Sequence, residues 1–285
     1  MKYSIVISVS ETKFGSVVFR ENLLENIAKA YQFGYDAVEL AVKNPEIIDY
    51  NKLVNSLNKY SLSIPAIGTG QIYFDEGISF SDESKDIRKK AVERVCKIID
   101  LANGLNSAVI IGLIRGNVTD SEDNWDKKLI NAEKRICECL QICLQYSENF
   151  NTLFLIEPLI RYNSNIFNTL EQVSNFLDKF KNVLNIKRIG ILADTFHMNV
   201  EEVFIEDSIA NNQNLIKYIH FSDSNRLAPG YGHIDFKKIL KILIKENYDS
   251  FISFEIMPFP DSETAAKVAL EYTKDIEKNI KKNFN

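Results

Sequence analysis

Short apolar runs recur along the whole chain and alternate with longer amphipathic segments. Most of these runs are apolar at nearly every position, as in AVIIGLI at 108–114 and TLFLIE at 152–157. Continuous apolar runs are typical of parallel strands that are covered on both faces. The pattern predicts eight strands: Ser4–Ser8, Ala37–Ala41, Ser63–Gly68, Ser107–Leu113, Thr152–Glu157, Arg188–Ala193, Ile216–Phe221 and Phe251–Glu255.

The segments between the predicted strands carry apolar residues at spacings of three and four, which predicts helices. The expected helices are Arg20–Phe33, Tyr50–Tyr60, Ser84–Asn103, Asn124–Glu148, Thr169–Phe180, Phe236–Glu246 and Asp261–Lys282. Eight strand–helix units of about 36 residues each suit a (β/α)8 TIM barrel. An open doubly wound sheet is the main alternative, but SETKFGSV after the first strand has one glycine where a dinucleotide-binding loop needs three. Without a linker-like stretch, residues 1–285 are expected to form one domain.

Composition and charge narrow the class of protein. Hydrophobic residues make up 45% of the chain and charged residues 26%, which is ordinary for a globular protein. The formal net charge of −5 lacks the basic excess of a nucleic-acid-binding protein, so we expect no nucleic-acid partner. We also find no secretory signal and no run long enough to span a membrane. These features, with three of the four cysteines crowded at 137–143, favour a cytoplasmic protein with free thiols.

Four consecutive predicted strands end in a residue that commonly binds metals. The residues are Glu157, Asp194, His220 and Glu255, separated by 37, 26 and 35 positions. Each separation is close to one strand–helix repeat, and the carboxyl ends of barrel strands converge on the face where active sites are built. Any one acidic residue there could instead cap the following helix or pair with a lysine.

Three carboxylates and an imidazole brought together would be costly to bury unless a cation neutralises them. The sequence therefore predicts one divalent metal ion as cofactor. Oxygen ligands with a single nitrogen favour Mn²⁺, with Mg²⁺, Co²⁺ or Zn²⁺ as alternatives.

Motifs along nearly the whole chain resemble the sugar phosphate isomerase/epimerase family, which belongs to the xylose-isomerase-like TIM barrels and includes the ketose 3-epimerases. The motifs are GTGQIY from Gly68, VIIGLIRG from Val109, EPLIRYNSNIFNT from Glu157, DTFHMN from Asp194, HFSDSNR from His220, PGYGHIDF from Pro229 and FEIMP from Phe254. One position departs from the ketose 3-epimerase pattern, because Asn163 stands where those enzymes have a second glutamate. This departure weakens the case for a free-ketose 3-epimerase but leaves the metal ligands intact.

The resemblance implies roles for particular residues. Glu157, Asp194, His220 and Glu255 would hold the metal, and Glu157 and Glu255 would also act as the catalytic acid/base pair. His197 and Arg226 would contact substrate oxygens. Alternatively, His197 could be a loop histidine that packs against the start of its own helix, and Arg226 could form a surface salt bridge.

Three further residues have weaker support. Arg115 could bind an anionic substrate or form a structural ion pair. Asp223 could orient His220, because metal-bound imidazoles usually need such a partner. His233 lies in a glycine-rich loop that could cover the substrate, although glycine there could serve only to turn the chain.

The expected function is therefore a divalent-metal-dependent isomerase or epimerase of a sugar, sugar phosphate or related polyol ketone. Proton transfer would pass through an enediolate that the metal stabilises. A keto-inositol dehydratase uses the same first step and is the main alternative. A non-catalytic carbohydrate-binding barrel and a relative of the abasic-site endonucleases are less favoured, the latter because three histidines are too few for a trinuclear zinc site. The protein could form homo-oligomers.

Overall fold

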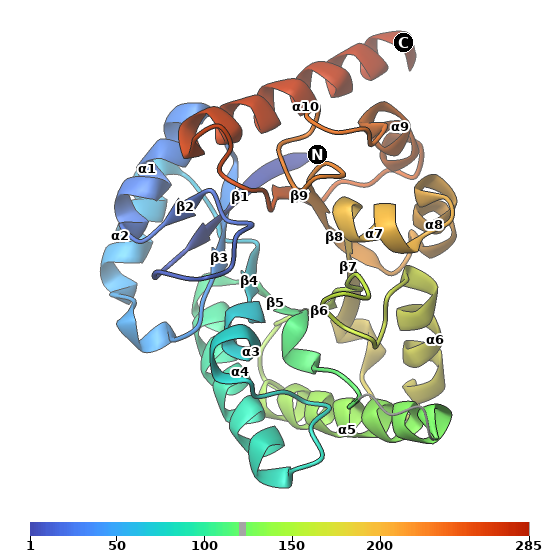
Figure 1. Cartoon of the computed structure of the whole chain (residues 1–285). Helices are drawn as coiled ribbons and strands as arrows, with labels where there is room; N and C mark the ends of the chain where they lie inside the picture. Colours follow the sequence, from blue (N-terminus) through green and yellow to red (C-terminus); the bar gives the residue numbers. More distant parts are fainter. Residues whose placement is uncertain (120–123, 285) are drawn as a thin grey trace.

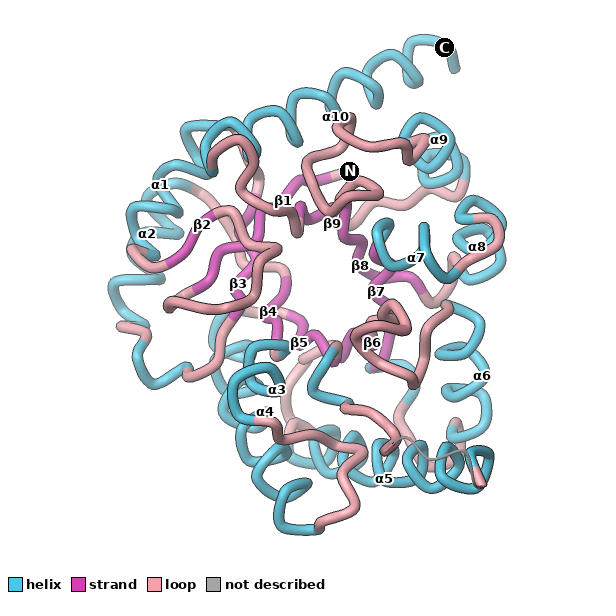
Figure 2. The backbone as a smooth tube through the Cα atoms, in the orientation of Figure 1, coloured by secondary structure: helices cyan, strands magenta, loops and turns pink. Residues whose placement is uncertain are grey.

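The computed structural model describes residues 1–119 and 124–284, and these residues form a closed parallel barrel (Figures 1 and 2). Eight strands build the barrel: β1 (Lys2–Ser8), β3 (Ala37–Ala41), β4 (Ala66–Gly68), β5 (Ala108–Ile111), β6 (Phe154–Ile156), β7 (Ile189–Asp194), β8 (Ile216–Phe221) and β9 (Phe251–Phe254). Neighbours along the chain pair in order, and β9 pairs with β1 to close the ring. The predicted TIM barrel is confirmed.

Helices surround the strands on the outside (Figure 2). They are α1 (Leu23–Phe33), α2 (Tyr50–Tyr60), α3 (Gly70–Glu76), α4 (Lys85–Leu105), α5 (Trp125–Tyr146), α6 (Leu170–Phe180), α7 (Thr195–Glu201), α8 (Ile205–Asn212), α9 (Phe236–Lys245) and α10 (Ser262–Phe284). The outward side chains of the strands and the apolar faces of these helices form one large buried core. This double coverage explains why the strands are apolar at nearly every position.

Side chains also fill the barrel's interior in layers. The inward residues Ala66, Ile110, Leu155, Leu192 and Tyr218 form a separate apolar cluster that closes the lower part of the barrel. Above them, at the carboxyl ends of the strands, the inward positions become polar. This arrangement produces a plugged barrel with a polar site at its open end, as is general for this architecture.

Several short elements were not predicted from the apolar pattern. The chain after β1 forms the two-residue strand β2 (Phe19–Arg20), which pairs with the end of β1, so α1 begins at Leu23 rather than at the expected Arg20. Helices α3, α7 and α8 have seven or eight residues each. Elements this short contain too few turns to show helical periodicity in the sequence.

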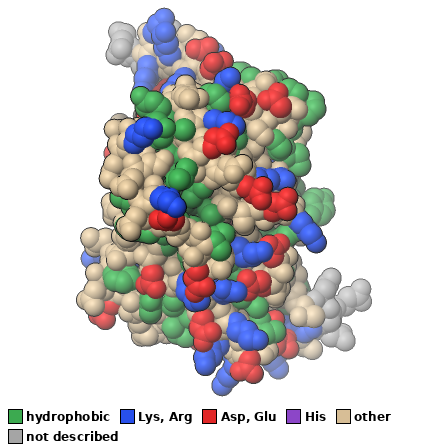
Figure 3. All heavy atoms as spheres, turned by 90° about the vertical axis from the view of Figure 1, so that its left-hand side faces the viewer, with side chains coloured by type: hydrophobic (Ala, Val, Ile, Leu, Met, Phe, Trp, Pro, Cys, Tyr) green, Lys and Arg blue, Asp and Glu red, His purple; other side chains and the backbone are tan. Residues whose placement is uncertain are grey.

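Charged side chains of both signs are present on the surface. Figure 3 shows basic and acidic side chains interspersed over one face, without a continuous basic stripe on that face. Among the described residues, no helix is both long and apolar enough to cross a lipid bilayer.

Candidate metal centre and active site

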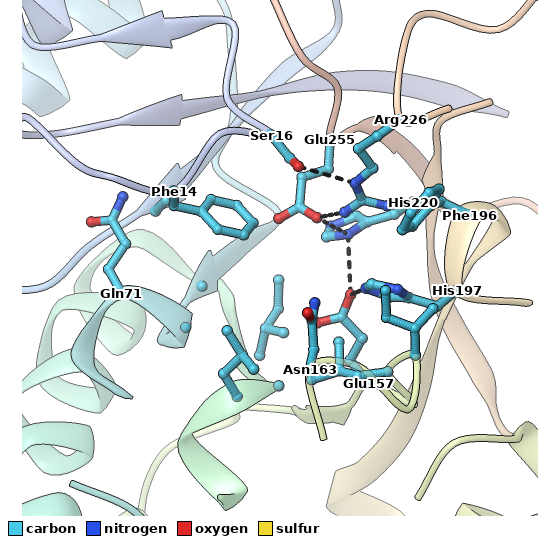
Figure 4. Close-up of a pocket in the computed structure, with 18 of the residues that line it drawn as sticks. Phe14, Ser16, Gln71, Glu157, Asn163, Phe196, His197, His220, Arg226 and Glu255 are labelled. Carbon is cyan, nitrogen blue, oxygen red and sulfur yellow. Dashed lines mark hydrogen bonds and ion pairs between the residues drawn. The ribbon is translucent and has the colours of Figure 1, made fainter. Parts of the chain in front are cut away.

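The four predicted ligands converge at the carboxyl ends of four neighbouring strands. Figure 4 shows three of them, Glu157, His220 and Glu255. Asp194 is the last residue of β7, His220 lies within β8, and Glu157 and Glu255 directly follow β6 and β9. One ligand atom from each residue lies within 4.8 Å of all the others. Nδ1 of His220 is 3.5 Å from Asp194 Oδ2, 3.6 Å from Glu157 Oε1 and 3.7 Å from Glu255 Oε2.

Among the four candidate ligands, two polar atoms are buried without a hydrogen-bond partner. They are Nδ1 of His220 and Oε1 of Glu157, which face each other. A buried polar atom without a partner is costly, so such atoms usually indicate a missing ion or ligand. Three carboxylates and one imidazole nitrogen around a common point are a suitable donor set for a divalent cation. The residues therefore fit the predicted metal ion.

Arg226 lies across the same centre and neutralises part of its charge. Its Nη1 donates to both carboxylate oxygens of Asp194 at 2.7 Å, and its Nη2 donates to Oε2 of Glu255. Ser16 and Ser222 accept further hydrogen bonds from the guanidinium. Burial alone would raise the pKa of Asp194, but Arg226 and the neighbouring His197 and His220 together outweigh burial and hold that pKa well below its usual range.

Asp194 also begins a helix. Its Oδ1 accepts hydrogen bonds from the backbone amides of Phe196 and His197 at the start of α7. The capping role that was the alternative to metal binding is therefore present in the structure, and it leaves Oδ2 facing His220. One residue thus anchors a helix and belongs to the candidate metal centre.

His197 lies on α7 beside Glu157. Its Nε2 is 3.8 Å from Glu157 Oε1, and its ring is buried. Burial lowers the pKa of His197 to about 4, so the imidazole is neutral near pH 7. A neutral imidazole can both donate and accept hydrogen bonds, which suits contact with sugar hydroxyls.

Glu39 is a member of this site that sequence reasoning missed. It lies in the middle of β3 and is only 1% exposed, and its Oε2 is 2.9 Å from Nε2 of His220. The available signal was a single charged residue inside the otherwise apolar strand Ala37–Ala41. Burial opposes a charged His220, but Glu39 and Asp194 outweigh it and raise the pKa of His220 well above its usual value.

Asp223 does not orient His220 as expected. Its carboxylate accepts hydrogen bonds from the backbone amides of Ser224, Gly230 and Ile234, and so it organises the loop after β8. A carboxylate surrounded by amides has little capacity left for a ring nitrogen. Glu39 occupies the position beside His220 that Asp223 was expected to hold.

Arg115 does not line the cavity beside the four candidate ligands. Its guanidinium is completely buried and donates to the backbone oxygens of Gly112, Glu157, Ile166 and Phe167. The prediction that Arg115 binds an anionic substrate is therefore wrong, because the N–H groups that an anion would need already donate to these backbone oxygens. Burial lowers the pKa of Arg115 to about 10. Its role is to join the end of β5 to the loop after β6.

His233 does not line the cavity either. Its ring is exposed, and its Nδ1 is 3.0 Å from Oγ of Ser224 within the same loop. The predicted substrate contact by His233 is therefore not supported by its position. The loop's glycine residues serve the turn, because Gly230 has a positive φ of 96°.

The metal centre forms one end of a cavity of about 250 Å³. Its other walls are mainly apolar and come from Phe14, Leu113, Leu159, Ile160, Phe196 and Met257, with Gln71 and Asn163 as polar members. Arg226 is the only lysine or arginine among the residues that line this cavity. Asn163 lines the same cavity as Glu157 and Phe14 (Figure 4).

Comparisons with known proteins agree with this fold. A family model described as "Xylose isomerase-like TIM barrel" matches residues 27–276. The chain is 25% identical to 3-dehydro-D-guloside 4-epimerase of Escherichia coli, over 83% of this chain and 88% of that protein. It is 24% identical to a ketose 3-epimerase of Arthrobacter globiformis, over 82% of this chain and 78% of that protein.

A solved structure also has the same fold. The D-allulose 3-epimerase of a Methylomonas species, in complex with D-allulose, superposes with a TM-score of 0.79. The two chains share 22% sequence identity, and the match covers 96% of each. The whole barrel is therefore shared, including the face that carries the candidate site.

Proposed function

Because the chain belongs to the xylose isomerase-like TIM barrel family, we propose that it is a divalent-metal-dependent epimerase of an uncharged keto sugar. The observation that carries this proposal is the placement of two glutamates around one metal-binding point. Glu157 and Glu255 approach His220 from opposite sides of the cavity (Figure 4). Relatives that epimerise keto sugars support the substrate class.

The two glutamates can invert a carbon atom that lies beside a carbonyl group. One carboxylate removes the proton from one face of the sugar, and the other, in its protonated form, returns a proton to the opposite face. A bound divalent cation would polarise the carbonyl and make the neighbouring C–H bond more acidic. His197 and Arg226 would hold the substrate oxygens, and the apolar walls would limit the access of water to the reacting carbon.

The charges of the cavity support a substrate without phosphate. The charge of Arg226, the one lysine or arginine in the lining, is already balanced by Asp194 and Glu255, so Arg226 can donate a hydrogen bond to a sugar oxygen but offers no net charge to a phosphate. Arg115, the other arginine considered for phosphate, donates only to backbone oxygens. A phosphate at the apolar end of the cavity would lose its hydration without gaining a partner, which is costly.

Solvent-exchange experiments test the proposal. The Mn²⁺-loaded protein is incubated in D₂O with ketoses, 3-keto-glycosides, ketose phosphates and keto-inositols, and the products are analysed by NMR and mass spectrometry. We expect an epimer that carries one deuterium at the carbon beside the carbonyl. Glu157→Gln and Glu255→Gln should each lower exchange by about 100- to 10,000-fold.

Glu271→Gln provides a control, because Glu271 is exposed on the outer helix α10. The Mn²⁺ content of each variant is measured in parallel, so that loss of the acid/base group is separated from loss of the metal. A product lighter by one water would favour the dehydratase instead. Exchange confined to ketose phosphates would contradict the uncharged substrate, and binding without any exchange would contradict an enzyme.

A further inference from the structure

Glu39 is a buried carboxylate on a different part of the barrel from the four predicted metal ligands. Side chains alternate between the two faces of a strand, so Glu39 points into the barrel while Val38 and Leu40 point to the surrounding helices. Within the described part of the chain, no lysine or arginine lies within 4.0 Å of its carboxylate; its ion-pair partner is His220. An unpaired buried charge is costly, so His220 is the group that accounts for its presence.

The contact between the two residues fixes the role of each nitrogen of the imidazole ring. An ionised carboxylate can only accept hydrogen bonds, so the 2.9 Å contact requires the proton of His220 to be on Nε2. Nδ1 is then directed toward Glu157, Asp194 and Glu255, and it has no hydrogen-bond partner. When a cation takes the place of any proton on Nδ1, the imidazole presents the Nδ1 lone pair to the centre of the site.

We propose that Glu39 is a positioning residue that holds His220 in the orientation and tautomer required to bind a cation through Nδ1. This inference rests on the metal centre of the proposed function but not on the sugar. Glu39 acts through His220 and need not itself bind the cation. Its negative charge also makes the imidazole a stronger ligand.

Metal affinity of the purified protein tests this role without any substrate. The dissociation constant for Mn²⁺ is measured by calorimetry for the wild-type protein and for Glu39→Gln, which keeps a hydrogen-bond acceptor but removes the charge. We expect Glu39→Gln to bind Mn²⁺ about 10- to 100-fold more weakly. Glu39→Ala, which also removes the acceptor, should bind more weakly still.

Glu277→Gln is the matched control. Glu277 is also a buried carboxylate, 8% exposed, but it lies on α10 and accepts a hydrogen bond from the Tyr3 hydroxyl outside the cavity. This variant should keep the wild-type affinity for Mn²⁺. If Glu39→Gln binds Mn²⁺ as tightly as the wild-type protein does, the positioning role is overturned.

A second measurement needs no variant of Glu39, so it decides the question even if those variants fail to fold. The wild-type protein is labelled with ¹⁵N-histidine and loaded with diamagnetic Zn²⁺, and long-range ¹H–¹⁵N spectra report which ring nitrogens carry protons. The chain has three histidines, so His197→Asn and His233→Asn suffice to assign the signals. We expect His220 to carry its proton on Nε2, and a proton on Nδ1 would overturn the proposal.

The outcomes separate this inference from the proposed function. A wild-type protein that binds neither Mn²⁺ nor Zn²⁺ would contradict both. Metal binding with an unchanged affinity in Glu39→Gln would contradict the positioning role alone. Metal binding that depends on Glu39, without deuterium exchange on any keto sugar, would support the positioning role and contradict the epimerase.

Discussion

At the scale of single residues, one glycine leaves room for a carboxylate at the candidate metal centre. Gly112 follows β5, and a Cβ atom added there would lie 2.6 Å from Oε2 of Glu157. This distance is shorter than any ordinary contact between such atoms. The carboxylate of Glu157 can therefore take its present position only because residue 112 has no side chain.

We predict that Gly112→Ala displaces the carboxylate of Glu157 and weakens Mn²⁺ binding by about 10-fold or more, as expected when a ligand loses its orientation. Calorimetry measures the change. Gly70→Ala is the control, because the nearest atom to an added Cβ there is Leu113 Cδ1 at 3.8 Å. Equal affinity in the two variants would show that the close approach of Gly112 to Glu157 is unimportant.

The sequence identified the four candidate ligands because each one lies at the end of a predicted strand or within one residue of it. Glu39 was missed because it lies inside a strand, where one charged residue among apolar ones gives no indication of its partner. The positions of Arg115 and Asp223 depend on which backbone groups the loops bring toward them. The pattern of apolar residues along the chain does not contain that information.

At the scale of elements, an ion pair connects the loop after β6 to the helix α7. Glu201 accepts hydrogen bonds from the side chain and the backbone amide of Arg161. The side chain of Glu201 is only 4% exposed, whereas that of Arg161 is 62% exposed. This pair fixes the loop of residues 158–169, which supplies part of the cavity wall, against the helix that carries His197.

We predict that Glu201→Gln increases amide hydrogen exchange in residues 158–169 at pH 7, because it removes the charge that holds Arg161. Exchange in β6 and β7 should remain unchanged and serves as the internal control. Hydrogen-exchange mass spectrometry measures both. Equal protection of the loop in the variant and the wild-type protein would contradict this role of the ion pair.

The same pair has a defined pH dependence. Burial opposes ionisation of Glu201, but Arg161 outweighs it and lowers the pKa of Glu201 in the folded protein. The unfolded protein therefore takes up the proton first as the pH falls, so the contribution of the pair to stability is present above about pH 4.5 and is lost below it. Glu201→Gln should lack this part of the acid-induced loss of stability.

At the scale of the whole molecule, the order of strands and helices was predictable because a TIM barrel repeats one strand–helix unit. The strands Ala37–Ala41 and Ile216–Phe221 match their predicted bounds. The closure of the ring was an expectation from the number of units, and it requires β1 and β9 to pair across almost the whole length of the chain. The short helices α3, α7 and α8 could not be predicted, since their packing against loops, rather than a periodic sequence pattern, determines where they form.

Closure of the barrel is also what assembles the candidate metal centre. Glu39 comes from β3, whereas the four candidate ligands come from the strand ends of β6 to β9. The pairing of β9 with β1 and of β1 with β3 brings these two groups of residues to the same cavity. The site therefore exists only in the complete barrel.

The most direct measurement is the anomalous diffraction of crystals soaked with Mn²⁺ and recorded at the manganese absorption edge. We predict one strong peak per chain, coordinated by Glu157, Asp194, Glu255 and Nδ1 of His220, with Nε2 of His220 still bonded to Glu39. Crystals of Asp194→Asn should show a weaker peak at the same place. A soaked crystal without a peak among these four side chains would contradict the metal centre and the mechanism built on it.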